Sequence, residues 1–421
     1  MMSYVRFAVL FFGLAISTLV SHGAYMQMVG IIILSIYCLS SEKIRREIFE
    51  RDTVLAVAIV MAIITAFFLY FIAFTPPNCA PALVKSALNN YLFLGLVTLY
   101  VVCLRATMKV EAEKIISALS ALIIVNVLIL LLQTVVLIAS NTYIDFVEPV
   151  TGEMSRYHNY ENLNPVFAFR PTGLYVEPST FSAALAVMTI GYLLLCRAQK
   201  RDPHFLPVIL SIIAMLITQS TAAVVQCALL LVAIMSNRTK STRAIIAVLL
   251  VGGLVAAPSF IEAYLDSFTT KMSESSELRL ALMDFIYHQR SGWDWLLGYG
   301  PFALEDPLYR LTDTGGKYQV ASLNDAGLLQ YFVVRFGMLG FAIPVLFFIR
   351  VRKDIPHLLF LVILLTVKLS YAEPVLYIGL LPLLMRLPKQ ANASIRQPEA
   401  ESPGSLDDIA MGHPPYPTQR T

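Results

Sequence analysis

The feature that most constrains this chain is a series of apolar runs, each roughly 15 to 25 residues long, separated by short polar segments. About 20 apolar residues in a helix cross a hydrocarbon layer of about 30 Å, whereas the strands of a membrane barrel are shorter and alternate in polarity. Of the 421 residues, 57% are hydrophobic and only 14% are charged, which the surface of a soluble protein does not tolerate. The sequence therefore predicts an all-α, polytopic transmembrane bundle of about twelve helices.

Basic residues are distributed unevenly between these runs, and their positions predict the topology. Loops rich in Lys and Arg remain in the cytoplasm. With about twelve helices all the basic clusters fall on one side, so both termini are expected in the cytoplasm. The clusters are Lys43–Arg51, Arg105–Lys114, Arg197–Arg201, Arg238–Arg243 and Arg350–Lys353.

The same pattern divides the chain into a membrane domain and a tail. Residues 1–386 form the transmembrane domain, with large external loops at about 140–178 and 261–324, and the Pro-rich stretch 387–421 is expected to be a disordered cytoplasmic tail. The expected helices lie at about 4–20, 24–40, 53–74, 88–104, 115–139, 205–218, 222–236, 244–260, 357–371 and 375–386, with two more that end at Arg197 and Arg350.

The first external loop brings a charged pair to the start of a helix. Arg170 and Glu177 lie in the segment Asn164–Ser179, and Glu177 precedes Pro178, a pattern typical of a helix N-terminus. One interpretation makes Glu177 a helix cap and Arg170 an anchor at the membrane interface. The other gives both residues a role in chemistry.

The second external loop carries arginines and tryptophans. Arg279, Arg290 and Arg310 offer planar guanidinium groups that grip phosphate oxygens at two points, and Trp293 and Trp295 are placed to stack on a sugar ring. Solvated arginines and tryptophans of the interfacial belt are the alternative interpretation. Hydrophobic residues at helical spacing also predict an amphipathic helix on the membrane surface between residues 277 and 297.

One further ionisable residue lies within an apolar run. Lys368 falls between Phe360 and Tyr371, where a charge is costly unless it faces a cavity or a charged ligand, or extends to the membrane surface. The sequence contains no metal-binding cluster, phosphate-binding glycine loop, nucleophile elbow or cofactor motif. A metal-independent reaction without a cofactor, or no reaction, is expected, and nucleic acid is not an expected partner.

Four segments give the chain a family resemblance over roughly residues 160–345. They are Arg170–Pro178, Thr218–Thr221, Arg279 with Trp295–Gly300, and Asn324–Leu329 with Phe336–Gly340. With these segments the chain resembles O-antigen polymerases of the Wzy type, in a superfamily that also contains O-antigen ligases and exopolysaccharide polymerases. Two departures are an arginine missing from the second segment, where relatives often carry one, and an Arg-x10-Gly spacing that Arg170, Arg279 and Arg290 do not reproduce.

The resemblance implies a glycosyltransferase in the bacterial inner membrane. Such an enzyme transfers a glycan from undecaprenyl pyrophosphate to the terminal sugar of a second lipid-linked repeat unit at the periplasmic face. The bilayer, a flippase and a chain-length regulator are its expected partners. The implied catalytic residues are Arg170, Arg279 and Arg290 against the leaving pyrophosphate and either Glu177 or Asp325 near the acceptor hydroxyl, with Arg310, Trp293, Trp295 and Lys368 in substrate binding.

Three alternatives remain open at this stage. An O-antigen ligase would transfer the finished glycan to lipid A core, but ligases place a His-Asn pair where this chain has Asn324-Asp325, and no histidine lies between His288 and His357. A lipid-linked oligosaccharide flippase does not need two long external loops, and no repeat relates the two halves of the chain. A membrane scaffold without activity leaves the external arginines without a purpose.

Overall fold

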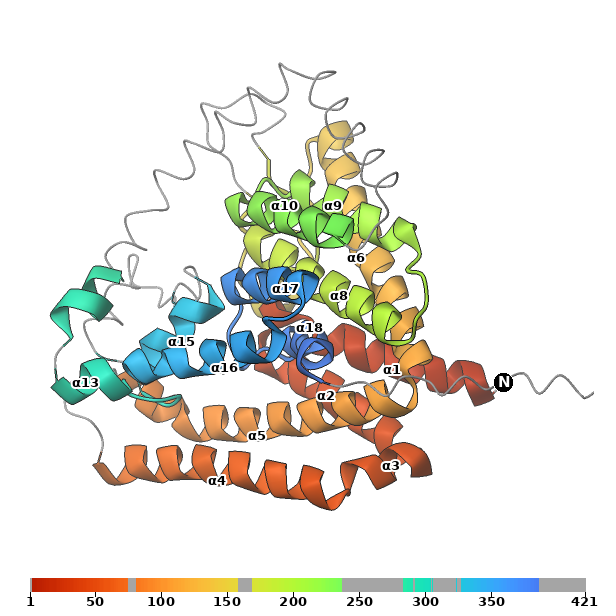
Figure 1. The fold of residues 1–421 in the computed structure, drawn as a ribbon. Coiled ribbons are helices and arrows are strands. Elements are labelled where there is room, and N and C mark those ends of the chain that lie inside the picture. Colours follow the sequence, from red (N-terminus) through yellow and green to blue (C-terminus); the bar gives the residue numbers. More distant parts are fainter. Residues whose placement is uncertain are drawn as a thin grey trace, which may run out of the picture. The chain divides into compact units, whose positions relative to one another are not determined.

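The computed structural model describes residues 2–74, 81–157, 169–236, 283–290, 292–303, 305, 323 and 327–385. All of these residues lie in the first of two units of the chain, Met1–Leu387. Within the described residues every regular element is a helix, as the sequence predicts (Figure 1). The expected helix at 244–260 and the expected tail at 387–421 lie outside the described residues.

Within the described residues, the longer apolar runs form helices close to their predicted positions. The helices that the argument uses are α1 (Met2–Ser17), α2 (Gly23–Leu39), α3 (Glu42–Ile48), α4 (Arg51–Phe74), α5 (Pro81–Val110), α6 (Ala112–Ser140), α7 (Glu148–Thr151), α8 (Pro178–Ala198), α9 (Phe205–Ile217), α10 (Thr221–Ser236), α13 (Gly292–Leu297), α15 (Leu328–Phe336), α16 (Ala342–Val351), α17 (Ile355–Thr366) and α18 (Pro374–Leu384).

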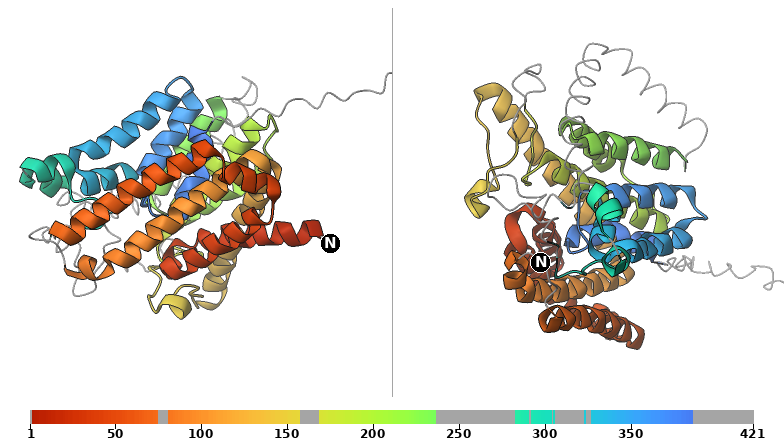
Figure 2. Two further views of the ribbon diagram at one scale, coloured as in Figure 1. Left: turned by 90° about the horizontal axis from the view of Figure 1, so that it is seen from below. Right: turned by 90° about the vertical axis from the view of Figure 1, so that its left-hand side faces the viewer.

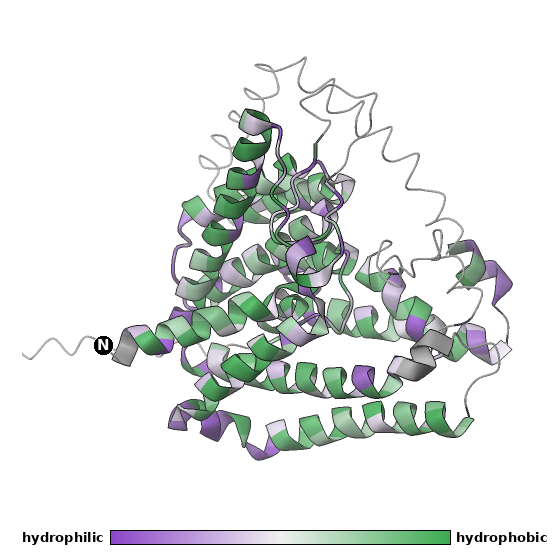
Figure 3. Ribbon diagram, turned by 180° about the vertical axis from the view of Figure 1, so that it is seen from behind, coloured by the Kyte–Doolittle hydropathy of each residue, from purple (hydrophilic) through white to green (hydrophobic). Residues whose placement is uncertain are grey.

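The described helices are those of a membrane protein. Six segments are long and apolar enough to cross a bilayer, and five shorter apolar helices accompany them. The count of twelve and the orientation of the termini stay predictions. Figure 3 shows hydrophobic residues along most of the helices and hydrophilic ones mainly in loops and near helix ends. The six segments are Val20–Leu39, Arg51–Phe74, Ser86–Val110, Ala112–Ser140, Pro178–Ala198 and Leu328–Val351.

Helix α8 is the most enclosed of these segments, with 83% of its apolar window buried, and α6, α9, α10, α17 and α18 pack around it. Its contact with α18 is especially close, because a Cβ on Gly191 would lie 2.4 Å from the carbonyl oxygen of Ile378. Helix α4 is the opposite case: it packs alongside α5 (Figures 1 and 2) and is only 6% buried. Many exposed apolar side chains on α4 are typical of a face that contacts lipid.

The structure corrects the sequence expectations for two of the apolar helices. The helix expected at 357–371 ends at Thr366, because Val367 is extended and its carbonyl oxygen accepts the Leu328 N–H at 3.1 Å. Lys368 therefore lies in the turn between α17 and α18, not in a helix. The expected helix ending at Arg350 is interrupted after α15 at Gly337, which has a φ of +58°.

The described part of the expected amphipathic helix at 277–297 is also interrupted. A π-helix at Phe285–Gln289 and the short helix α13 are separated at Arg290, whose backbone is extended. In addition, the first basic loop contains α3, which the sequence analysis did not anticipate.

Candidate active site

The segment before α8 is a folded turn held by the side chain of Gln133 on α6. The Gln133 Oε1 atom accepts the backbone N–H groups of Thr172 and Gly173 at 3.0 and 2.8 Å, and its Nε2 atom donates to the Ile144 carbonyl at 2.7 Å. Gly173 has a φ of +59°, and a Cβ there would lie 2.7 Å from the ring of Phe181. The turn therefore requires glycine at this position.

The end of this turn is tied to the connection between α1 and α2. The Val176 N–H donates to Ser21 Oγ at 2.9 Å, and the Tyr175 hydroxyl donates to the Thr18 carbonyl at 3.3 Å. The Arg156 N–H donates to the Val176 carbonyl at 2.7 Å. These bonds fix the next residue, Glu177, at the start of α8.

The Glu177 carboxylate brings together cations from two distant parts of the chain. Oε1 accepts a hydrogen bond from Arg156, and Oε2 accepts hydrogen bonds from Lys368 and, at 3.0 Å, from Ser179. Although Glu177 occupies the N-cap position of α8, its side chain makes no capping bond. Its side chain therefore forms ion pairs and does not cap the helix, unlike the interpretation of the sequence in which Glu177 is a helix cap.

The protonation state of Glu177 follows from these partners. Burial alone would raise the pKa of its carboxyl, but the charges of Lys368 and Arg156 outweigh burial and hold the pKa below its ordinary value. The side chains of Glu177 and Lys368 are each only 15% exposed. Glu177 is therefore an ionised group at neutral pH, shared between two cations.

A cavity of about 380 Å³ opens beside this ion-pair cluster of Arg156, Glu177 and Lys368. Two further acidic residues, Glu153 and Glu373, line the cavity. Glu373 belongs to the turn between α17 and α18, and its Oε2 atom accepts a hydrogen bond from Gln27 Nε2 at 2.7 Å. The lining residues are Val20, Ser21, Gly23, Glu153, Arg156, Val176, Glu177, Thr180, Tyr331, Lys368, Leu369, Ser370 and Glu373.

The environment of Glu373 differs from that of Glu177. Burial raises the pKa of the Glu373 carboxyl to about 7, and hydrogen bonds from Gln27 and Ser370 offset only part of this effect. The sequence analysis singled out neither Glu373 nor Arg156. The signal for Glu373 was present, because Glu373-Pro374 repeats the Glu177-Pro178 pattern before an apolar helix.

Arg170 lies outside this cavity and joins two of the family segments. Its backbone N–H donates to the Tyr157 carbonyl at 3.1 Å, and its Nε atom donates to the Thr218 carbonyl, at the end of α9, at 3.4 Å. The Gln219 Nε2 atom donates in return to the Phe169 carbonyl at 3.3 Å. The segment around Arg170 thus contacts the α9–α10 hairpin.

Arg290 also lies outside the cavity, and its side chain contacts other parts of the protein. Its guanidinium is buried and forms an ion pair with Glu305, with 2.6 Å between Nε and Oε1 and 2.8 Å between Nη2 and Oε2. The carbonyl of Val334 accepts a further bond at 2.8 Å. These contacts join the segment after the π-helix to α15.

The third and fourth family segments pack on one another. The Gly300 N–H donates to the Arg335 carbonyl at 2.7 Å, and a Cβ on Gly337 would lie 2.6 Å from the Leu296 backbone. Trp293 and Trp295 are 73% and 38% exposed and do not line the cavity. The other candidates, Arg279, Arg310 and Asp325, lie outside the described residues.

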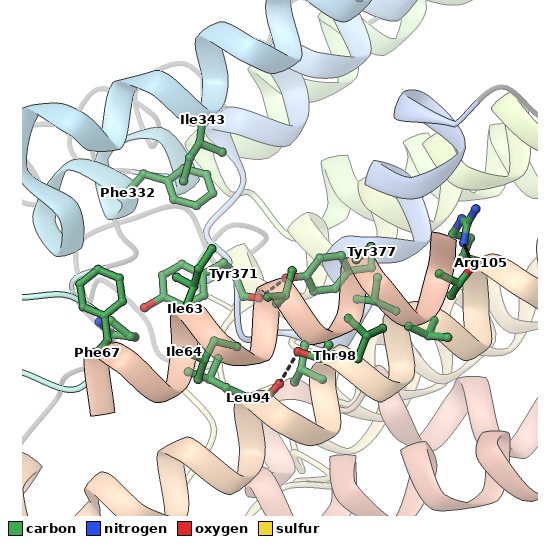
Figure 4. Close-up of a pocket in the computed structure, with 18 of the residues that line it drawn as sticks. Ile63, Ile64, Phe67, Leu94, Thr98, Arg105, Phe332, Ile343, Tyr371 and Tyr377 are labelled. Carbon is green, nitrogen blue, oxygen red and sulfur yellow. Dashed lines mark hydrogen bonds between the residues drawn. The ribbon is translucent and has the colours of Figure 1, made fainter. Parts of the chain in front are cut away.

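An apolar groove of about 520 Å³ has α4 and α5 on one side and α15, α16 and α18 on the other (Figure 4). Tyr371, from the same turn as Lys368 and Glu373, lines the groove, and its ring centroid lies 5.3 Å from that of Tyr331, which lines the charged cavity. The tyrosine pair therefore lies between the groove and the cavity. The groove also includes Arg105 among its lining residues.

The apolar helices define a helical membrane protein, and its charged cavity lies beside an apolar groove. The family model described as WcaD colanic acid polymerase matches residues 4–280, and the chain belongs to this family. No curated protein and no solved structure matches the chain.

Membership in this family confirms the predicted resemblance to polymerases of the Wzy type and the general class of polysaccharide polymerase. The matched region contains Arg156, Arg170, Glu177 and Arg279, whereas Lys368 and Glu373 lie beyond its end. Within the described residues, no group of three or more His, Cys, Asp or Glu side chains is placed to hold a metal ion.

Proposed function

We propose that this protein joins lipid-linked repeat units into a polysaccharide at the periplasmic face of the bacterial inner membrane. The donor is a glycan on undecaprenyl pyrophosphate, and the acceptor is a hydroxyl on the terminal sugar of a second lipid-linked unit. The acceptor oxygen forms a bond to the anomeric carbon of the donor, the bond from that carbon to the pyrophosphate breaks, and the acceptor proton is lost. Membership in a polysaccharide polymerase family supports this reaction class.

The observation that carries the proposal is the convergence of Arg156 and Lys368 on Glu177 at the edge of the cavity. Both cations line the cavity, and Arg156 also lies 3.6 Å from a carboxylate oxygen of Glu153. A pyrophosphate in the cavity would lie against the guanidinium and the ammonium, the groups that bind phosphate oxygens most strongly. These cations would stabilise the negative charge that develops as the lipid pyrophosphate leaves.

The apolar groove supports a donor with a long hydrocarbon tail. Its walls are almost entirely aliphatic and aromatic side chains, and it lies on the other side of the Tyr331–Tyr371 pair from the charged cavity. A lipid whose pyrophosphate occupies the cavity would place its polyisoprenoid tail in the groove. Burial of the tail in the groove would favour donor binding, because it removes apolar surface from water.

The family description supports a proposal about the class of polysaccharide that the protein makes. The description names colanic acid, and we propose an exopolysaccharide as the product in preference to lipopolysaccharide or capsule. A flippase that delivers the repeat units and a regulator of chain length are the proposed partners. Arg279, within the matched region, is retained as a further candidate for pyrophosphate binding, whereas the contacts of Arg290 support a structural role.

The test uses purified protein in vesicles supplied with a repeat unit on undecaprenyl pyrophosphate, and it follows the size of the lipid-linked glycan. The proposal predicts a ladder of longer glycans that remain on the lipid pyrophosphate. Transfer only to added lipid A core would identify a ligase. Movement of unextended units across the bilayer would identify a flippase, and either result would contradict the proposal.

A further inference from the structure

Three carboxylates line the cavity, and two of them, Glu177 and Glu373, lie in opposite environments, whereas Glu153 is 56% exposed and pairs with Arg156. Glu177 accepts hydrogen bonds from the two cations Arg156 and Lys368. Within the described part of the chain, Glu373 instead receives hydrogen bonds from neutral groups, the amide of Gln27 and the hydroxyl of Ser370. When two acids in one site are placed so differently, they are suited to different tasks.

We infer that Glu373 is the general base of the reaction, and that it removes the proton from the acceptor hydroxyl as the new glycosidic bond forms. This inference rests on the proposed function. A lone pair of the acceptor oxygen forms the bond to the anomeric carbon, the proton moves to the Glu373 carboxylate, and the electrons of the O–H bond remain on the oxygen. The electrons of the broken bond leave with the lipid pyrophosphate beside Arg156 and Lys368, and the proton on Glu373 then passes to solvent.

The placement of Glu373 fits this division of roles. It lines the same cavity as the two cations but forms no ion pair with them in the described residues, so the base and the anion-binding groups occupy separate parts of one site. A base already neutralised by cations would be weak, and this excludes Glu177 from the task. The other charged or titratable groups that face the cavity are Glu153, Arg156, Glu177, Tyr331 and Lys368.

Two features favour Glu373 as a proton acceptor near neutral pH. Burial raises the pKa of its carboxyl to about 7, the range in which a general base is most effective. The bond from Gln27 Nε2 to Oε2, at 2.7 Å, also fixes the orientation of the carboxylate from α2. A carboxylate held in this way does not have to be ordered again when the acceptor binds.

A purely structural role is the competing explanation, because the same bond joins α2 to the α17–α18 turn. The experiment measures single-turnover glycan extension against pH for the wild-type protein, Glu373→Gln and Glu373→Asp, together with binding of a fluorescent donor and the melting temperature. Lys43→Ala, on the exposed face of α3, serves as the control variant.

The inference predicts a wild-type rate that rises with pH to a plateau, with a midpoint near the Glu373 pKa of about 7. Glu373→Gln should lower the plateau rate by about 100-fold or more with donor binding and melting unchanged, and Glu373→Asp should restore part of the rate. A wild-type rate in Glu373→Gln, or an unchanged pH profile in that variant, would overturn the assignment. If the wild-type protein extends no glycan at any pH, the proposed function itself fails.

Discussion

The ammonium of Lys368 donates a hydrogen bond to Oε2 of Glu177 across 191 residues of sequence. This contact joins the turn between α17 and α18 to the start of α8. Arg156 completes the cluster from the loop after α7. Three segments that are separate in the sequence therefore meet at one carboxylate, and the cavity opens beside it.

The lowered pKa of Glu177 predicts a specific dependence of stability on pH. A carboxyl whose pKa is lower in the folded than in the unfolded state stabilises the fold above its unfolded pKa, and this contribution is lost as the pH falls through the folded value. The melting temperature of the wild-type protein should therefore fall as the pH drops below about 4.5. Glu177→Gln should reduce this fall, as measured by tryptophan fluorescence in detergent. An identical pH dependence in both proteins would contradict the ion-pair assignment.

Gly173 should be the least replaceable residue of the turn before α8. Gly173→Ala combines a positive φ with a Cβ only 2.7 Å from the Phe181 ring, so it should destabilise the protein by more than about 1 kcal/mol. Gly152 also has a positive φ, but a Cβ there would meet no atom within 4 Å. Thermal melting should therefore show a larger loss for Gly173→Ala than for Gly152→Ala. Equal losses of stability in the two variants would show that the close contact with Phe181 does not contribute to the destabilisation.

Replacement of Arg290 should lower the stability of the folded protein, because its ion-pair partner Glu305 is buried. Arg290→Ala leaves Glu305 buried without its ion pair and should cost about 3 to 5 kcal/mol of stability. Arg46→Ala, which removes an exposed partner of Glu42, should cost less than about 1 kcal/mol. A double variant, Arg290→Met with Glu305→Leu, should recover stability and glycan extension. Recovered stability without extension would restore a catalytic role to Arg290.

The groove can be tested with a bulky substitution. Ile64→Trp should fill part of the groove and weaken binding of a donor with a long polyisoprenoid tail, but not of one with a short tail. Ile59→Trp is the matched control, because Ile59 lies on the same helix, is 53% exposed and does not line the groove. A titration of fluorescent donors in detergent gives both affinities. Equal affinity of both variants for the long-tailed donor would exclude the groove as the tail site.

The long apolar runs of α4 and α6 show what the sequence predicts well, because a run of this length has few alternatives to a helix in lipid. The charged pair before a helix N-terminus is also visible locally, and the structure places Glu177 at the cavity and Arg170 outside it. Lys368 was recognised as unusual, but its partner was not, because nothing in a linear pattern reveals a contact across 191 residues.

Other parts of the site had no local signal that could separate function from structure. Arg156 lies in a polar loop without periodicity, and only the folded turn brings it to Glu177. The residue type of Arg290 suits phosphate binding, and only the structure shows that its guanidinium forms an ion pair with Glu305 of the same loop. The sequence shows the chemistry of such side chains, whereas tertiary packing determines what they contact.

The measurement that tests the central claim most directly is the rate of glycan extension by purified protein carrying Lys368→Ala or Arg156→Ala. Each variant removes one cation from the site proposed for the leaving pyrophosphate, and each should lower the rate by about 100- to 1000-fold, equivalent to about 2.7 to 4 kcal/mol, with the fold intact. The exposed controls Lys43→Ala and Arg46→Ala should retain the wild-type rate. Wild-type extension by both site variants would contradict the account, because the cluster at Glu177 would then have no part in the reaction.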